Sequence, residues 1–135
     1  MSNQTKLPHY GPLPQPKGLE EARQVLAQER FEAPRVDVVE FHATEFTAIC
    51  PRTGQPDFGT VTIKYRPDKY CLESKSLKFY LWAWRNEGAF CETLAETIAD
   101  DIFEAIEPHE VEVLVTQNVR GGIALQAKAR RSKEE

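Results

Sequence analysis

The chain has 135 residues, 41% of them hydrophobic and 28% charged, and its formal net charge is −4. These values are typical of one globular domain with its own core, and the acidic balance disfavours a nucleic-acid partner. No apolar run is long enough to cross a bilayer and the N-terminus lacks a signal-peptide stretch, so we expect no membrane contact and a cytoplasmic location. The three cysteines and three histidines lack metal-ligand spacing, which argues against a metal site and a disulfide framework.

Proline content and the spacing of apolar residues divide the beginning of the chain into an extended arm and a helix. Residues 1–17 hold four of the nine prolines, which predicts an extended arm. The stretch GLEEARQVLAQER (18–30) places its apolar residues on one face and predicts a helix. We expect a single folded domain over 18–130, followed by a short polar tail at 131–135.

After this helix, the spacing of the apolar residues changes along the chain, from the two-residue period of strands to the 3.6-residue period of helices and back. The expected elements are a strand over 36–49, a loop over 50–57, a strand over 58–65, helices over 75–86 and 90–107, and strands over 111–115 and 123–127. We expect a bulge near Val39, an N-cap at Ser74 and fraying from Ala129 onward. The order predicts an α+β fold, in which a four-stranded antiparallel sheet has helices on one face. Such a sheet has two open edges, which favours association of subunits.

Cys50 and Asp57 flank the loop between the first two expected strands. A cysteine is most often a small packed side chain, but loops on a rigid scaffold also carry nucleophiles. The thiolate is the reactive form, so Cys50 needs a base or a positive charge nearby. Asp57 follows seven residues later, and a folded-back loop would let its carboxyl move a proton to or from the sulfur or its adduct. Taken alone, Asp57 equally fits an exposed loop residue.

The octet ESKSLKFY (73–80) predicts an anion site. Lys75 and Lys78 share one helical face, and the helix N-terminus adds N–H donors and the positive end of the dipole. Arg120 and Gly121 lie in the last turn, where a guanidinium could reach a phosphate. Each feature also has an ordinary interpretation, as solvated lysines or as a hairpin turn. The chain has no GxGxxG motif, so a nicotinamide cofactor would not bind in the Rossmann manner.

Glu92 opens the second long helix. A carboxylate at that position usually compensates the helix dipole. It could instead accept two parallel N–H bonds from a guanine-like edge, and the residue type does not decide between the two.

Three stretches of the chain carry a family resemblance. They are FTAICPRTGQPDFG (46–59), LESKSLKFYLWAWRNEG (72–88) and the RGG turn (120–122). In sequence, order and spacing they resemble the short-chain family of NADPH-dependent 7-cyano-7-deazaguanine reductases of queuosine biosynthesis. The octet within the second stretch is close to a signature of that family, and the resemblance covers roughly residues 30–127.

The resemblance implies a tunnelling fold (ββααββ), in which subunits join their sheets into a barrel. It implies a homo-oligomer of two stacked rings with active sites between neighbouring subunits. The implied reaction is NADPH-dependent reduction of the nitrile of 7-cyano-7-deazaguanine to 7-aminomethyl-7-deazaguanine, through a thioimide on Cys50 with Asp57 as proton donor. The implied contacts are Leu72, Glu73, Ser74, Cys91 and Glu92 with the substrate, and Lys75, Lys78, Arg120 and Gly121 with NADPH.

The chain departs from the family at one position, because Cys91-Glu92 stands where the family usually has His-Glu. The histidine orients the substrate and assists proton movement, which a thiol does poorly at neutral pH. We expect this departure to affect the rate more than the class of reaction. We also hypothesise that Cys91 faces the same pocket as Cys50 and can form a disulfide with it.

Two other functions stay open from the sequence. One is that of an amidine-forming relative that adds ammonia to the same nitrile without hydride transfer. The other is that of a non-catalytic module that binds a purine or RNA. The intact octet favours the reductase over the first, and the presence of both Cys50 and Asp57 argues against the second.

Overall fold

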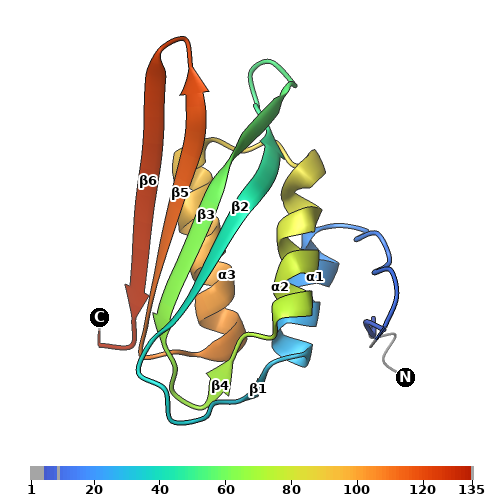
Figure 1. Cartoon of the computed structure of the whole chain (residues 1–135), viewed down its shortest axis with the longest axis vertical. Coiled ribbons are helices and arrows are strands. Elements are labelled where there is room, and N and C mark those ends of the chain that lie inside the picture. The colour runs from blue at the N-terminus through green and yellow to red at the C-terminus, as the bar shows by residue number, and fades with distance from the viewer. Residues whose placement is uncertain (1–4, 9, 135) are drawn as a thin grey trace.

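The computed structural model describes residues 5–8 and 10–134. The elements run in the chain order α1 (Leu19–Gln28), β1 (Phe31–Glu32), β2 (Val39–Ile49), β3 (Pro56–Arg66), β4 (Tyr70–Cys71), α2 (Ser74–Ala83), the 3₁₀ helix η1 (Trp84–Asn86), α3 (Cys91–Ile106), β5 (Glu110–Arg120) and β6 (Ile123–Ser132). Two long hairpins, β2–β3 and β5–β6, flank the helical segment α2–α3 in sequence and lie side by side in space (Figure 1).

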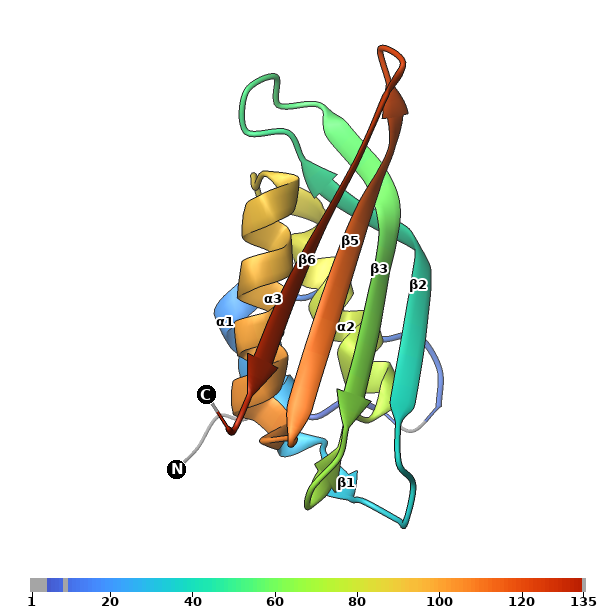
Figure 2. The ribbon, with the colours of Figure 1, turned by 90° about the vertical axis from the view of Figure 1, so that its left-hand side faces the viewer.

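The main sheet has the strand order β2-β3-β5-β6, and every neighbouring pair is antiparallel. The helices cover one face of this sheet and leave the other face open (Figure 2). The predicted α+β fold with the order ββααββ is therefore confirmed. The small two-stranded sheet of β1 and β4 was not predicted. No helix in the described part of the chain is long and apolar enough to span a membrane.

Helix α3 provides one side of the core. Its residues Leu94, Ile98, Ile102 and Ile106 recur at every fourth position and are all buried, and the helix packs on β5 and β6. Burial of each such side chain stabilises the fold by about 1.5–3 kcal/mol. The helix ends at Glu107, whose φ of 49° is left-handed, directly before a proline that cannot continue it.

A polar chain connects the three helices behind the sheet. The buried Tyr80 of α2 donates its hydroxyl hydrogen to Asp101 of α3 at 2.5 Å. The same carboxylate pairs with Arg23 of α1 at 2.9 Å. Burial and the neighbouring Asp101 charge raise the pKa of Tyr80 well above its ordinary value, so the phenol stays protonated and keeps the three helices together.

The structure corrects two details of the strands. The bulge of β2 lies between Ala43 and Phe46, not near Val39. The prediction of a frayed end from Ala129 is wrong, because β6 continues to Ser132 opposite Glu110. Cross-strand pairing therefore orders a segment whose polar composition had suggested disorder.

The described part of the N-terminal arm contacts the helices through Thr5, Leu7 and Pro8. Leu7 is buried, and the Thr5 hydroxyl donates to Glu21 of α1 at 2.7 Å. The carbonyl oxygen of Pro8 accepts a hydrogen bond from the Lys75 ammonium at 3.0 Å. The arm thus reaches the beginning of α2.

Candidate active site

Cys50 lies in the tight loop that closes the β2–β3 hairpin. Its N–H donates to the Gln55 carbonyl at 2.8 Å, and its carbonyl accepts from Gly54 N–H at 2.9 Å. Gly54 supplies the positive φ of 72° that this turn requires. The loop leaves the thiol partly open to solvent on a strand end that the sheet holds rigid.

The loop also activates the thiol. Hydrogen bonds to the sulfur from the Thr53 hydroxyl, and then from the backbone N–H groups of Thr53 and Arg52, lower the pKa of Cys50. They outweigh the opposing effect of the Asp57 charge. Hydrogen bonds to the charged form favour that form, so the loop increases the thiolate fraction near neutral pH. The activation comes from hydrogen-bond donors that the sequence analysis did not single out.

Asp57 is brought next to this loop by the register of the hairpin. It pairs with Ala48 across β2 and β3, and it is only 5% exposed. Its carboxylate forms an ion pair with Arg120 of β5. The charge of Asp57 acts on the thiols of both Cys50 and Cys91, so the three groups share one region of the molecule.

Cys91 is the first residue of α3 and is buried. Its thiol lies 3.5 Å from the Val115 carbonyl and donates to it. Burial, together with the charges of Glu92 and Asp57, raises the pKa of Cys91. The two cysteines therefore differ: Cys50 is activated and partly exposed, whereas Cys91 is buried and protonated.

Six of the predicted site residues gather around the ends of the two hairpins and the start of α3. We call them the thiol cluster, and its members are Cys50, Asp57, Cys91, Glu92, Arg120 and Gly121. Glu92 is exposed in the first turn of α3, and Gly121 has the positive φ of 59° that the β5–β6 turn requires. The ion pair between Arg120 and Asp57 ties this turn to β3.

Four more of the predicted residues, Leu72, Glu73, Ser74 and Lys75, lie around the start of α2, and we call them the helix-start cluster. Leu72 is buried and donates its N–H to the Tyr65 hydroxyl at 2.9 Å. Glu73, not Ser74, is the N-cap: its carboxylate accepts from Lys75 N–H at 2.8 Å and from Ser76 N–H at 2.9 Å. Two of the N–H donors expected to bind an anion are therefore already occupied by a carboxylate.

The two clusters lie at opposite ends of α2. Ser74 begins this helix, whereas its far end continues through η1 to Glu87, whose carbonyl accepts from Ile49 N–H at 3.0 Å beside the Cys50 loop. Ten helical residues rise about 15 Å. One chain therefore does not bring Glu73 and Cys50 to the same small ligand.

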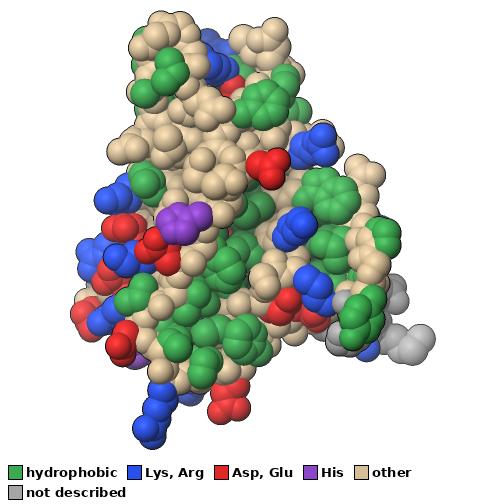
Figure 3. Space-filling view, viewed as in Figure 1, with side chains coloured by type: hydrophobic (Ala, Val, Ile, Leu, Met, Phe, Trp, Pro, Cys, Tyr) green, Lys and Arg blue, Asp and Glu red, His purple; other side chains and the backbone are tan. Residues whose placement is uncertain are grey.

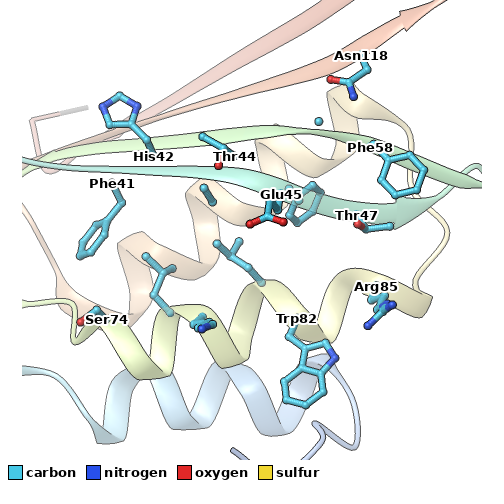
Figure 4. Close-up of a pocket in the computed structure, with 16 residues that line it drawn as sticks. Phe41, His42, Thr44, Glu45, Thr47, Phe58, Ser74, Trp82, Arg85 and Asn118 are labelled. Atoms are coloured by element: carbon cyan, nitrogen blue, oxygen red, sulfur yellow. The ribbon is translucent and has the colours of Figure 1, made fainter.

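A groove of about 900 Å³ runs between the edge strand β2 and α2 (Figure 4). From α2 it is lined by Ser74, Leu77, Lys78, Leu81 and Trp82, and from η1 by Arg85. Apolar side chains lie over this space on the molecular surface (Figure 3). Neither Cys50 nor Asp57 lines the groove, and of the two predicted phosphate lysines only Lys78 does. Sequence reasoning missed Arg85, although it follows Lys78 and Trp82 at helical spacing.

Comparisons with known proteins identify the family and the fold of the chain. The family model described as "QueF-like protein" matches residues 56–135, so Asp57 lies inside the match and Cys50 six residues before it. The crystal structure of the archaeosine synthase QueF-Like in the apo form superposes with a TM-score of 0.68, at 22% identity, over 72% of this chain and 95% of that one. At this identity the likeness supports the fold alone.

Three relatives carry the name NADPH-dependent 7-cyano-7-deazaguanine reductase. The protein of Thermomicrobium roseum is 51% identical over 85 residues, which are 63% of this chain and 66% of that protein. The protein of Chlorobaculum tepidum is 49% identical over 85 residues, 63% of this chain and 73% of that one. The protein of Ruthia magnifica is 42% identical over 98 residues, 70% of this chain and 77% of that one. The chain spans just under two thirds of the first relative's length. Together with the family match, these identities show that the chain belongs to the QueF-like protein family.

Proposed function

We propose that this protein is a cytoplasmic NADPH-dependent reductase that converts the nitrile of 7-cyano-7-deazaguanine to the aminomethyl group, a step in the queuosine modification of tRNA. The names of the relatives at 42–51% identity support the substrate and the reductant. The observation that carries the proposal is the Cys50 thiol, whose pKa is lowered by the hairpin loop, with Asp57 held on the adjoining strand.

The proposed chemistry uses these two groups in turn. The Cys50 thiolate attacks the nitrile carbon, a C–S bond forms, and one C–N π bond breaks. Asp57 accepts the proton that the Cys50 thiol loses and passes it to the nitrogen, which gives a neutral thioimide. Covalent capture divides a difficult reduction into easier steps. When bound, NADPH supplies the hydride for each of the two reductions that lead to the amine.

The NADPH-binding side chains proposed here would have to exchange partners. Arg120 pairs with Asp57, and the Lys75 ammonium donates to the Pro8 carbonyl, whereas Lys78 lines the open groove. The Arg120 side chain is 55% exposed, so its guanidinium can move to a phosphate at little desolvation cost. Binding of a dinucleotide phosphate by Arg120 would then release Asp57 for proton transfer.

The substrate would lie between two copies of the chain. The helix-start cluster and the thiol cluster are about 15 Å apart along α2. A small ligand that contacts both clusters would therefore contact each of them on a different subunit. We propose that subunits join the open edges of β2 and β6 into a barrel, and that two such rings stack. The Leu72–Ser74 segment of one copy would then hold the base while the Cys50 of another attacks it.

A mixing experiment tests this shared site. Cys50→Ala and Glu73→Ala subunits, each with low activity alone, are dissociated, mixed and reassembled. Random assembly gives about a quarter of the sites an intact Cys50 and an intact Glu73 from different copies, so activity should return. If Glu73→Ala alone keeps full activity, or if the mixture stays inactive, the shared site is wrong.

The test of the reaction is NADPH oxidation with free 7-cyano-7-deazaguanine, followed by its absorbance. Wild type should consume NADPH, and Cys50→Ala should not. Cys71→Ala is the matched control, because it removes a thiol that is buried in β4 and lies outside both clusters. NADPH consumption that survives in Cys50→Ala would overturn the proposed nucleophile.

The second candidate is the addition of ammonia to the same nitrile, which gives an amidine without hydride transfer, and the fold that the chain shares with the archaeosine synthase supports it. Mass spectrometry of the protein mixed with the nitrile in the absence of NADPH separates the possibilities. A covalent adduct together with NADPH oxidation supports the reductase. An adduct without oxidation supports the amidine-forming enzyme, and reversible binding without an adduct supports a purine-binding module.

A further inference from the structure

The segment 72–74, which is proposed above to bind the base, lies between a two-residue strand and a helix (Figure 1). Strand β4 pairs with β1 only at Tyr70 and Cys71, and α2 begins at Ser74. Neither the strand ladder nor the helix therefore supplies a partner for the N–H of Leu72, which is only 2% exposed. A buried N–H without a partner destabilises the conformation that carries it, so this backbone needs another anchor.

The hydroxyl of Tyr65 is that anchor. Tyr65 lies in β3, where the register places it between Val39 of β2 and Val111 of β5, and it is buried. Its oxygen accepts a hydrogen bond from the N–H of Leu72 at 2.9 Å. Burial raises the pKa of Tyr65 far above its ordinary value, so the phenol stays protonated and the contact does not titrate near neutral pH. One side chain thus ties the segment to the rigid main sheet.

A second buried hydroxyl holds the middle of the segment. The side chain of Ser76 is fully buried, which is uncommon for a serine. Its Oγ donates to the carbonyl of Glu73 at 2.8 Å. The same carbonyl accepts from the N–H of Leu77 at 3.1 Å, so the orientation of this peptide group is fixed by two donors. The backbone of the segment is therefore held from the interior of the protein on both sides of the peptide bond that joins Leu72 to Glu73.

We propose that Tyr65 and Ser76 are positioning residues of the base site, which fix the extended backbone of the segment 72–74 before the substrate binds. The inference rests on the proposed function, because it takes this segment as the one that binds the base. The two inward hydrogen bonds leave the exposed Ser74 facing the groove (Figure 4). A segment that is already held in its bound geometry loses less conformational entropy on binding. Loss of either hydroxyl should therefore weaken substrate binding and leave the chemical step at Cys50 unchanged.

Two tyrosine variants separate positioning from stability. Tyr65→Phe keeps the ring and removes the hydroxyl that accepts from Leu72. Tyr80→Phe is the matched control, because it also removes the hydroxyl of a buried tyrosine, but one that donates to Asp101 of α3. NADPH oxidation at varied nitrile concentration gives KM and kcat, and urea unfolding gives the stability of each variant. A loss of binding that does not affect the chemical step raises KM at constant kcat.

Both variants should be less stable than wild type, but only Tyr65→Phe should raise the KM for the nitrile, by about tenfold, because it leaves a buried N–H without its partner. The kcat of both should stay within about twofold of wild type. An active, folded Tyr65→Phe with the KM of wild type would overturn the inference. Ser76→Ala is the second variant if Tyr65→Phe does not fold, because alanine suits a helix. It should also raise the KM for the nitrile, and an unchanged KM would overturn the inference.

Amide hydrogen exchange tests the contact without the reaction. The N–H of Leu72 should exchange about tenfold faster in Tyr65→Phe than in Tyr80→Phe, because only the first variant removes its partner. Equal exchange rates in the two variants would overturn the anchor. A wild type that does not oxidise NADPH would refute the proposed function, and the role in base binding with it. An active wild type whose KM does not respond to either hydroxyl would refute the positioning role alone, so the two failures are distinguishable.

Discussion

Replacing Glu73 by alanine should weaken α2 as well as any contact with a substrate. The carboxylate accepts from the N–H groups of Lys75 at 2.8 Å and Ser76 at 2.9 Å. These are two of the four N–H groups that a helix leaves without an internal partner at its start. Loss of an N-cap side chain lowers the free energy of unfolding by about 0.5–2 kcal/mol. Because Glu73 accepts two hydrogen bonds, we expect its loss to cost an amount in the upper half of that range. For a chain of this length, the melting temperature should fall by about 3–6 °C.

Urea unfolding followed by circular dichroism measures this effect. Glu92→Ala is the matched control, because Glu92 is also an acidic residue predicted to bind the substrate and also lies in a first helical turn, but it is exposed and caps nothing. Its loss should cost about 0.3–1 kcal/mol through the helix dipole alone. Equal unfolding midpoints for wild type and Glu73→Ala would refute the cap, whatever the variant does to activity.

Three further predictions concern the thiol cluster. Thr53→Val removes the hydrogen bond that most lowers the pKa of Cys50, so the pH profile of iodoacetamide alkylation should move to higher pH, and an unchanged profile would contradict the role of the hydroxyl. Cys91→His should keep or raise turnover, measured by NADPH oxidation, whereas a large loss would mean that the site is built around the thiol. Arg120→Gln should destabilise the fold by about 1–3 kcal/mol in urea unfolding, because it leaves the buried Asp57 carboxylate without its cation. It should also raise the KM for NADPH, and Asp57→Asn in the same chain should recover part of the stability but no activity.

The periodic parts of the fold could be predicted from the sequence because their signals are local. The four-residue spacing in α3 and the two-residue spacing in β3 each reflect burial of one face. The bulge of β2 also had a local signal, since Thr44 and Glu45 are consecutive polar residues that interrupt the alternation, and both are exposed. The strand β6 was underestimated because its inward residues are mostly small, as at Ala127 and Ala129, which gives a weak apolar period.

The start of α2 was predicted one residue too late because the prediction used only the preference of residue types for the N-cap position. Serine is a favoured N-cap and glutamate is not, so Ser74 was the better choice on composition. In the structure Glu73 is extended, with φ −93° and ψ 135°, and its longer side chain accepts from the N–H groups of the second and third residues of the helix, Lys75 and Ser76. The error matters for function, because it changes an open anion site into one that a carboxylate already fills.

The proximity of Asp57 to the Cys50 loop was predictable because a short hairpin joins them, whereas the ion pair of Asp57 with Arg120 spans 63 residues and depends on the register of β3 with β5. That pair gives Arg120 two competing partners, a carboxylate of the same chain and the phosphate proposed for it. In the proposed mechanism, this competition would link NADPH binding by Arg120 to release of Asp57 as the proton donor. The helix-start cluster has no such link, since it lies a helix length away from the sulfur. In the proposed shared site, the position of the substrate would therefore depend on how two subunits meet, and no local pattern in a single sequence encodes that contact.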